Sequence, residues 1–481
     1  MKNFTFNGIV TRLVAIAVVF MVSFSCSKDD VIEEPKESEY NSLSTFAFRK
    51  SDNAGLTEDC TSYMGGSTYY VTVPEGTDIT SLKPDFTISP KATIKINGNA
   101  ITGAVPAIDF TEVVKVAVTS ESGRERIIKV LVKPGRKELD HLVYELMSNH
   151  SIPGVSVAIS KGEETVYESG LGLAIVEDNT RVAPDHLFRL ASISKQFTTL
   201  CIMNLYEKDL LSVDDIVFGP GGILEEEFPS VKETDMAARV TIRHLLSHTS
   251  GWKSDPDPMF TSSFKGQSLN ERIRYMLESD QVTPGSKYSY YNMGFGVLGK
   301  IVEKLSGEKF EKYMRDMLAT IGVTDVHVGG DRSQRRSNEV VYYSQDGTNG
   351  YGNEMDVIAA AGGIIASPRE MLKVLYHIDG LPEIQDFITP ATRTLMLTAI
   401  PIYERYALGW RTGHRLFPGA SYHTGNLAGT AVMWVMGRTW ETGPKFNCVI
   451  LCNSRSYISG FDDDIYYLMN NVLNKAQTMS W

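Results

Sequence analysis

A serine and a lysine three residues apart are the first candidates for chemistry in this chain. Ser192 and Lys195 stand in the segment FRLASISKQFT, where an amphipathic helix is predicted to begin. A helix places residues i and i+3 about 60° apart, so the amine can lie beside the hydroxyl. A lysine amine can accept the serine proton, and free N–H groups at a helix N-terminus can stabilise an oxyanion. The pair therefore indicates a nucleophile and its base.

The spacing alone does not separate a nucleophile from a helix-capping serine. The same spacing to a lysine recurs at Ser25, Ser250, Ser262 and Ser306. The distinguishing feature of Ser192 is an apolar helical stripe after it, formed by Ile193, Phe197, Leu200, Cys201 and Leu205. The alternative, in which Ser192 only caps the helix, stays open until partners are found elsewhere in the sequence.

Two later segments hold polar side chains that could face this pair. Tyr290 and Asn292 stand two residues apart in PGSKYSYYNMGFG, and in extended backbone both would point into one cleft. The segment SYHTGN precedes an apolar run and supplies His423, Thr424, Gly425 and Asn426. Glycine at a strand edge lets a ligand approach the backbone closely. On the residues alone, a packing role for Tyr290 and a surface position for His423 remain alternatives.

The order Ser-x-x-Lys, Tyr-x-Asn, His-Thr-Gly resembles the serine β-lactamase and penicillin-binding protein superfamily, in the branch with class C β-lactamases and D-alanyl-D-alanine carboxypeptidases. The segments TIRHLLSHTSGW, AAGGIIASPREM and YALGW extend the resemblance over nearly all of 137–481. It implies a serine hydrolase that forms a covalent acyl-enzyme on peptidoglycan-type peptides, small esters or β-lactams. A penicillin-binding sensor without turnover, or a surface binding protein that retains the fold, is the alternative.

The resemblance also implies a role for each motif residue. Ser192 attacks the carbonyl, and Lys195 and Tyr290 handle the proton, with the acylation base left undecided between them. The N–H groups of Ser192 and Asn426 hold the oxyanion. The expected oxyanion and substrate-binding residues are Asn292, His423, Thr424, Gly425 and Asn426. We expect desolvation and nearby cations to lower the pKa of Lys195, and Lys195 to stabilise Tyr290 as a phenolate.

His423 departs from the family pattern, because many penicillin-interacting members carry lysine there. A neutral histidine offers no permanent cation to a substrate carboxylate. We therefore expect weak β-lactamase activity, and higher rates on carboxylate-bearing substrates after His423→Lys. His244 and His248, in RHLLSHTSG, are predicted to shape a loop without taking part in the chemistry.

Composition limits the other functions. The chain has 481 residues, 42% of them hydrophobic, and a net charge of −11. No basic block is present, which disfavours nucleic acid and leaves a small-molecule or peptide substrate as the expected partner. No Cys, His or Asp cluster has metal-ligand spacing, so neither a metal nor a cofactor is expected. Cys448 and Cys452 would lie roughly 13 Å apart on a strand, too far for a disulfide. Oligomeric state is not indicated.

The first 26 residues have the pattern of an export signal. Lys2 and Arg12 precede an apolar run that is too short to span a bilayer and ends in VSFSC. The segment resembles a bacterial lipoprotein signal with Cys26 as the lipidated residue. It implies export and a lipid anchor in the outer membrane, with exposure at the cell surface as one option. A plain secretory signal with an incidental cysteine is the alternative. Residues 27–41 are acidic and predicted to form a flexible tether.

The rest of the chain is predicted to form two domains. Residues 42–134 contain short β-rich runs separated by turn signals, typical of a small antiparallel β-sandwich, and resemble the immunoglobulin-like modules of Bacteroidetes surface lipoproteins. Residues 137–481 begin with a helix and a buried strand and end with two apolar strands and a helix. The expected fold is a β-lactamase-like α/β domain, with an antiparallel sheet flanked by helices and a helical subdomain.

Overall fold

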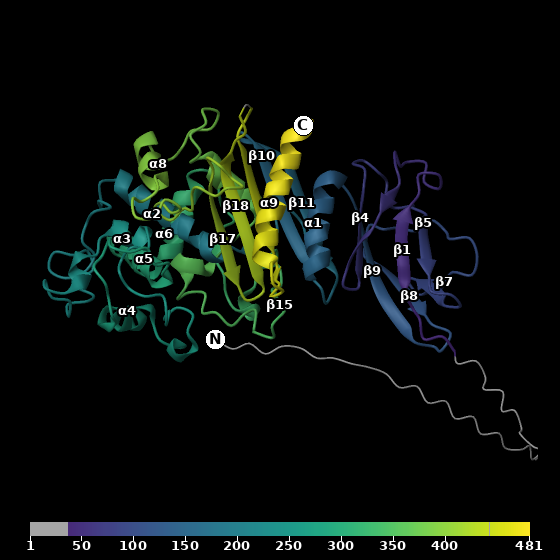
Figure 1. Cartoon of the computed structure of the whole chain (residues 1–481), viewed down its shortest axis with the longest axis horizontal. Helices are drawn as coiled ribbons and strands as arrows, with labels where there is room; N and C mark the ends of the chain where they lie inside the picture. Colours follow the sequence, from purple (N-terminus) through teal and green to yellow (C-terminus); the bar gives the residue numbers. More distant parts are fainter. Residues whose placement is uncertain (1–36, 442) are drawn as a thin grey trace, which may run out of the picture.

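The structure is a computed structural model that describes residues 37–441 and 443–481. The predicted signal 1–26, its Cys26 and most of the tether 27–41 lie outside the described residues. A β-rich N-terminal domain stands beside a larger α/β domain (Figure 1). No helix in the described part is both long and apolar enough to cross a membrane.

The N-terminal domain is a sandwich of two sheets. One sheet has the strand order β2-β1-β5, and the other has the order β3-β4-β9-β8-β6-β7. The strands are β1 (Leu43–Phe48), β2 (Cys60–Thr61), β3 (Tyr63–Gly65), β4 (Thr68–Val73), β5 (Pro84–Ile88), β6 (Thr93–Ile96), β7 (Asn99–Ala100), β8 (Val114–Thr119) and β9 (Glu125–Pro134). The prediction of a purely antiparallel sandwich is wrong at one pair, because β4 and β9 run parallel. The long connection between these strands makes the parallel pairing possible.

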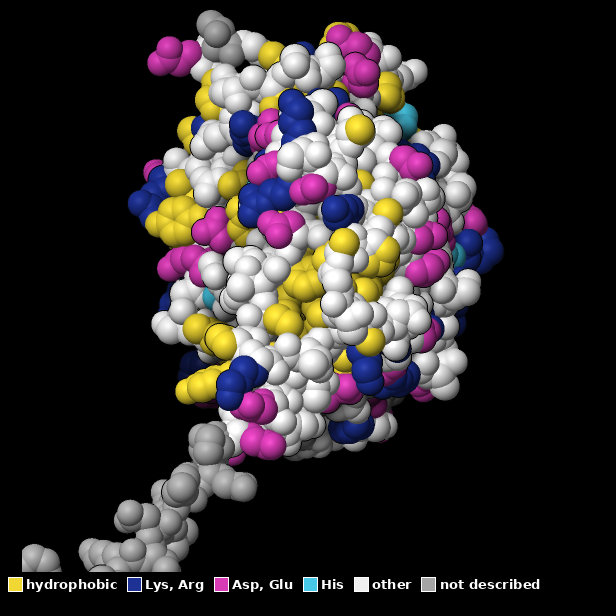
Figure 2. Space-filling view, turned by 90° about the vertical axis from the view of Figure 1, so that its right-hand side faces the viewer, with side chains coloured by type: hydrophobic (Ala, Val, Ile, Leu, Met, Phe, Trp, Pro, Cys, Tyr) yellow, Lys and Arg dark blue, Asp and Glu magenta, His cyan; other side chains and the backbone are white. Residues whose placement is uncertain are grey.

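The free end of the sandwich carries charges of both signs. Figure 2 shows Lys and Arg side chains interspersed with Asp and Glu around a central apolar area. Neither sign of charge dominates this face, so it has no extended basic surface of the kind that binds nucleic acid.

The C-terminal domain is built on a six-stranded sheet with the order β12-β11-β10-β19-β18-β17. Its strands are β10 (Gly154–Lys161), β11 (Glu164–Ile175), β12 (Thr180–Arg181), β17 (Ser421–Leu427), β18 (Thr430–Arg438) and β19 (Phe446–Cys452). All neighbouring strands are antiparallel, and β10 pairs with β19 from the far end of the chain. The predicted sheet, which the chain leaves and later rejoins, is confirmed.

Helices cover both faces of this sheet. Cys448 and Ile450 of β19 pack into the core beneath α1 and α9, whereas Val449 and Leu451 pack into the core that contains α2. Burial on both faces explains why the strand is apolar without alternation. The helices are α1 (Lys137–His150), α2 (Ser194–Glu207), α3 (Ile242–Leu246), α4 (Leu269–Glu278), α5 (Asn292–Ser306), α6 (Phe310–Ala319), α7 (Pro368–Tyr376), α8 (Pro390–Leu397) and α9 (Phe461–Thr478).

Shorter elements join the helical subdomain to the sheet. A three-stranded sheet has the order β13-β16-β14, and β15 pairs with β20. These strands are β13 (Phe188–Arg189), β14 (His327–Val328), β15 (Tyr343–Ser344), β16 (Ile364–Ala366) and β20 (Ser454–Arg455). A π-helical turn, Ala359–Gly363, packs against α2 and α5. This turn borders the start of α2, where the predicted nucleophile lies.

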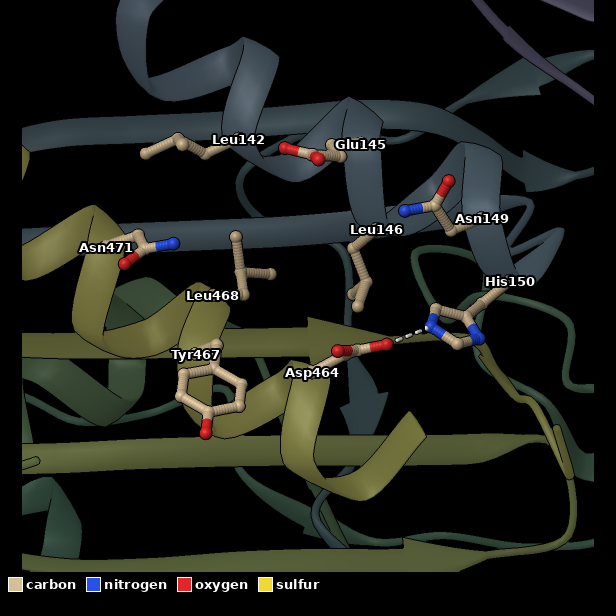
Figure 3. Close-up of a pocket in the computed structure, with 9 residues that line it drawn as sticks. All are labelled: Leu142, Glu145, Leu146, Asn149, His150, Asp464, Tyr467, Leu468 and Asn471. Carbon is tan, nitrogen blue, oxygen red and sulfur yellow. Dashed lines mark hydrogen bonds and ion pairs between the residues drawn. The ribbon is translucent and has the colours of Figure 1, made fainter. Parts of the chain in front are cut away.

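Helices α1 and α9 lie side by side on the face away from α2 (Figure 1). The His150 Nε2 atom lies 2.7 Å from an Asp464 carboxylate oxygen, which ties the end of α1 to the start of α9 (Figure 3). A cavity of about 130 Å³ lies between the two helices. None of the predicted site residues lines it. The contact between His150 and Asp464 therefore packs the two helices together, and the predicted site lies elsewhere in the domain.

A buried polar cluster joins the sandwich to the C-terminal domain. The Asp140 carboxylate of α1 is fully buried and accepts hydrogen bonds from Thr72 of β4 at 2.8 Å and Lys133 of β9 at 3.1 Å. Tyr167 of β11 donates to the same carboxylate. From the other side, the Arg181 guanidinium donates to the backbone carbonyls of Val132, Phe110 and Glu112. The sandwich is thus docked on the C-terminal domain through α1 and β12.

Removal of the sandwich is expected to destabilise the C-terminal domain. A fragment of residues 137–481 leaves the Asp140 carboxylate without Thr72 and Lys133, and loss of a buried charge partner costs about 3–5 kcal/mol. We expect the fragment to melt at a clearly lower temperature than the full chain in a calorimetric scan, and Asp140→Asn to recover part of the loss. Equal melting temperatures for fragment and full chain would contradict this view of the junction.

Candidate active site

Ser192 is presented by a strained turn at the start of α2. The residue before it, Ala191, has a φ of 47°, a left-handed conformation that is uncommon for alanine. Ser192 belongs to a 3₁₀ turn that runs directly into α2. Its side chain is partly exposed, whereas Ala191 and Ile193 on either side are buried. The turn therefore offers the Ser192 hydroxyl to solvent.

The Lys195 amine is buried beside that hydroxyl. Its Nζ lies 3.3 Å from the Ser192 Oγ and 2.7 Å from the Ala361 carbonyl oxygen of the π-helical turn. The side chain is fully buried, and its amine sits 5.0 Å from the Tyr290 ring centroid and 5.6 Å from that of Phe295. Apolar and aromatic surroundings of this kind disfavour the charged form.

Burial lowers the pKa of Lys195 to about 7, as the sequence predicted from desolvation. The Arg411 guanidinium lowers it further, while the Asp257 carboxylate opposes the shift. At a pH slightly above 7, most Lys195 amines are therefore uncharged and able to accept a proton.

Tyr290 is a protonated phenol in this site. Burial raises its pKa to about 12, partly offset by the Ser192 hydroxyl and by Arg411. The prediction of a phenolate stabilised by Lys195 is wrong, because burial disfavours the charged form of the phenol and raises the pKa of Tyr290 far above neutrality. The phenol oxygen is buried and has no hydrogen-bond partner of good geometry among residues 37–441 and 443–481, although Ser192 is near enough to affect its pKa.

Asn292 is held by an acid that sequence reasoning missed. It begins α5, and its Nδ2 donates to the Asp257 carboxylate at 2.7 Å. The nearby Lys195 amine donates to the Ala361 carbonyl oxygen and takes no part in holding Asn292. Burial raises the pKa of Asp257, opposed by the hydrogen bonds from Asn292 and the Met259 N–H. The segment KSDPDPMF gives no local sign that Asp257 reaches the site.

A directed chain of hydrogen bonds links His423 to His248. The Tyr291 N–H donates to His248 Nδ1 at 3.1 Å, so the proton of a neutral His248 is on Nε2, 3.0 Å from the Tyr406 hydroxyl. Tyr406 then donates to His423 Nε2 at 3.3 Å, and His423 Nδ1 donates to the Thr424 carbonyl at 2.6 Å. Every proton of the chain is thereby assigned.

This chain requires both histidines to be neutral. Burial is the main cause that holds the pKa of His248 and the pKa of His423 well below the usual value. The His248 ring also packs on Tyr290, with centroids 4.2 Å apart. His248 thus positions Tyr290 and the 423–424 strand, which goes beyond the loop-shaping role that the sequence suggested. His244 only caps α3, by a reciprocal pair of bonds with Thr241.

Arg411 supplies a cation that the sequence analysis did not find. Its guanidinium lies 5.8 Å from the Tyr290 ring centroid and 6.0 Å from that of Tyr406. Its charge is one cause of the lowered pKa of His423. Arg411 thus places near the site a permanent cation that the argument from His423 did not include. A lysine at His423 would bury a further charge beside Arg411 and Lys195, which opposes the benefit predicted for His423→Lys.

Gly425 allows strand β17 to lie against the Ser192 turn. A Cβ at this position would be 2.3 Å from the Leu190 carbonyl oxygen and 3.0 Å from the Ala191 Cβ. Gly425 therefore allows two segments of the chain to pack closely. The sequence predicted instead that it would allow a ligand to approach the backbone.

The free edge of β17 faces the site. Strand β17 is the last strand of its sheet, and the Tyr422 N–H and C=O bond to Arg411 outside the sheet. Since alternate residues of an antiparallel strand direct these groups the same way, the N–H groups of Thr424 and Asn426 also point off the edge. The Asn426 N–H thus has the orientation that an oxyanion donor needs, and the Thr424 carbonyl is held by His423.

Ser192, Lys195, Tyr290 and the His423 strand come together, as the motif order predicted. In the described part of the chain, no group of three or more His, Cys, Asp or Glu side chains could hold a metal ion. The four described cysteines, Cys60, Cys201, Cys448 and Cys452, are free and buried. The chemistry available at this site is nucleophilic attack by a hydroxyl beside a neutral amine.

Sequence comparison identifies relatives of the catalytic domain. Protein flp of Staphylococcus aureus is 26% identical over 186 residues, which cover 38% of this chain and 36% of that protein. A penicillin-binding protein of Bacillus subtilis is 33% identical over 190 residues, covering 37% of this chain and 38% of that protein. The chain thus spans well under half the length of these relatives. A family described as SGBP, N-terminal, matches residues 61–132 of the sandwich.

Solved structures share the fold of the C-terminal domain. The octameric penicillin-binding protein homologue from Pyrococcus abyssi is 25% identical, with a TM-score of 0.57 over 71% of this chain and 77% of that one. The D-alanine carboxypeptidase AmpC from Burkholderia cenocepacia is 18% identical, with a TM-score of 0.55 over 71% and 98%. The family described as Beta-lactamase matches residues 139–470, the region that contains every site residue above. The chain is therefore a member of the β-lactamase family.

Proposed function

We propose that this protein is a serine hydrolase that forms a covalent acyl-enzyme at Ser192 on amide or ester substrates. The observation that carries the proposal is the partly exposed Ser192 hydroxyl, 3.3 Å from the buried amine of Lys195. A hydroxyl beside a neutral amine is an activated nucleophile. Membership of the β-lactamase family supports this reading.

Lys195 is the acylation base in this proposal. The neutral amine takes the Ser192 proton as Oγ bonds to the substrate carbonyl carbon, and the N–H groups of Ser192 and Asn426 stabilise the oxyanion. Tyr290 gives its phenol proton to the leaving group and regains a proton from the Lys195 ammonium. Water then cleaves the acyl-enzyme and restores Ser192. The pKa of about 12 keeps Tyr290 protonated and suited to this donor step.

Arg411 is proposed to bind a carboxylate on the leaving group. Its guanidinium lies 5.8 Å from the ring centroid of Tyr290, the residue proposed to protonate the leaving group. Peptides that end in a free carboxylate, and β-lactams, carry such a group. We also propose, from the sequence alone, that the protein is exported and anchored to the outer membrane through Cys26.

The rate is expected to depend on pH through Lys195. Since the amine is the base only when unprotonated, kcat/KM should fall tenfold per pH unit below a pKa of about 7 and stay level above it. The pKa of Tyr290, about 12, sets no limit near neutrality. A pH profile of kcat/KM between about 5 and about 9 measures this. The fall of kcat/KM at acidic pH should persist in Tyr290→Phe. A kcat/KM that does not change with pH would exclude Lys195 as the titrating base.

Time-resolved intact-mass spectrometry tests the acyl-enzyme. With a fluorescent penicillin and an activated ester, the native protein should gain the mass of the acyl group and lose it again, and Ser192→Ala should show no adduct. Ser194→Ala is the matched control, because its hydroxyl accepts from the Ile364 N–H and is buried. An adduct that persists would point to a sensor without turnover. An adduct that Ser192→Ala retains would overturn the assignment.

A further inference from the structure

A cationic cavity of about 250 Å³ opens beside the active site. It lies between the loop that follows α8, the edge of β17 and the start of α9. The lining residues are Tyr403, Arg405, Arg411, His414, Arg415, Leu416, Tyr422, Asp463, Tyr466 and Tyr467. Among these, Arg411 also lies 5.8 Å from the Tyr290 ring centroid, so this one side chain borders both the cavity and the candidate active site.

The charges around this cavity are unbalanced. Arg405, Arg411 and Arg415 bring three guanidinium groups, against the single carboxylate of Asp463. Within the described residues, none of these three arginines forms an ion pair. The Arg411 Nε is buried without a hydrogen-bond partner there. In a chain with a net charge of −11, an unpaired cluster of cations is a local exception that favours an anionic ligand.

In the proposed mechanism the leaving group is next to Tyr290, and therefore next to Arg411 at the border of this cavity. Tyr290 delivers its proton to the leaving group in the proposed mechanism, and Arg411 covers the Tyr290 ring. A leaving group that passes Arg411 next meets Arg405 and Arg415. The Tyr466 ring that lines the cavity is held in place, because it stacks on the His414 ring with centroids 4.7 Å apart. The cavity therefore has a defined place in the reaction, given the proposed function.

We infer that this cavity selects leaving groups with two carboxylates. The nearer carboxylate binds Arg411, and the farther one binds Arg405 and Arg415. A leaving group with one carboxylate needs only Arg411 and leaves the other two cations without a partner. Because Arg405 and Arg415 are exposed, each contributes modestly and in a salt-dependent way. The inference rests on the proposed function and narrows its substrate class.

Three phenylacetyl thioesters test this inference. Their thiols are mercaptoethanol, mercaptoacetate and mercaptosuccinate, which carry no, one and two carboxylates, and thiol release is followed with a chromogenic thiol reagent. Arg405→Gln and Arg415→Gln should each lower kcat/KM for the mercaptosuccinate ester about threefold, and the double variant about tenfold. The mercaptoethanol ester should be unaffected. Arg126→Gln, on β9 of the sandwich, removes the same charge elsewhere and should change none of the three rates.

The outcomes separate this inference from the proposed function. If the native protein cleaves no thioester faster than Ser192→Ala does, the proposed function fails and the inference with it. If all three esters are cleaved by way of Ser192, but the arginine variants lower the three rates equally or not at all, only the inference is overturned. A loss limited to the mercaptosuccinate ester, and reduced by added salt, supports it.

Discussion

Replacement of Lys195 by methionine is expected to lower kcat/KM about 10⁴-fold, at the upper end of what a general base contributes. Methionine matches the length of the buried lysine stem but cannot accept the Ser192 proton. Tyr290→Phe keeps the amine and should cost about 100-fold, because it removes only the proton delivery to the leaving group. Steady-state kinetics on one activated ester and one amide measure both losses.

Two controls make the Lys195 result specific. Lys195→Arg keeps a positive charge near Ser192 but cannot be neutral at any working pH, so it should be as inactive as the methionine variant. Circular dichroism melting should show that all variants remain folded. A Tyr290→Phe loss as large as the Lys195→Met loss would contradict the assignment of Lys195 as the sole acylation base.

Gly425→Ala is expected to abolish most activity, because it displaces strand β17 without removing any reacting group. The added Cβ would lie 2.3 Å from the Leu190 carbonyl oxygen, and backbone cannot yield to it as a flexible side chain would. Strand β17 must then move away from the Ser192 turn and take the Asn426 N–H with it. A shift of about 1 Å can cost 10²-fold in rate, and overpacking costs about 1–3 kcal/mol in stability. Kinetics and thermal melting measure the two effects.

Gly294→Ala is the matched control for this substitution. Gly294 lies inside α5, and a Cβ there would meet its nearest neighbour, the Leu245 carbonyl oxygen, at 3.6 Å, an ordinary contact. Because alanine is the better helix former, this variant should be as stable as the native protein or more so, with near-native activity. Near-native activity in Gly425→Ala would show that β17 does not need its close approach to the nucleophile.

The sequence was sufficient to predict the elements whose patterns are local. The helix at 137–150 and the strands that became β10, β18 and β19 each show a long apolar or periodic run, and all are confirmed. The parallel pair of β4 and β9 was not predicted, because a strand pattern does not reveal which distant strand it joins. The docking of the sandwich through Asp140 was missed for the same reason, since nothing near Asp140 in sequence signals Thr72 or Lys133.

Only those residues of the candidate active site that belong to a motif could be predicted from the sequence. Ser192, Lys195, Tyr290 and His423 each belong to a recognisable segment, and the fold brings them together. Asp257, Tyr406 and Arg411 come from loops without such a pattern, and their roles follow from burial and charge that only folding creates. The prediction of a phenolate at Tyr290 is wrong for that reason, because the sequence does not show how deeply the Tyr290 phenol is buried.

Pairing of β10 with β19 also fixes when activity can arise during synthesis. The turn that carries Ser192 is translated early. Strands β17 to β19 of the sheet beside it follow more than two hundred residues later. Contacts of such long sequence separation form slowly and late in folding. A growing polypeptide that already contains Ser192 therefore lacks the assembled site, and the proposed hydrolase can act only after β19 has been made.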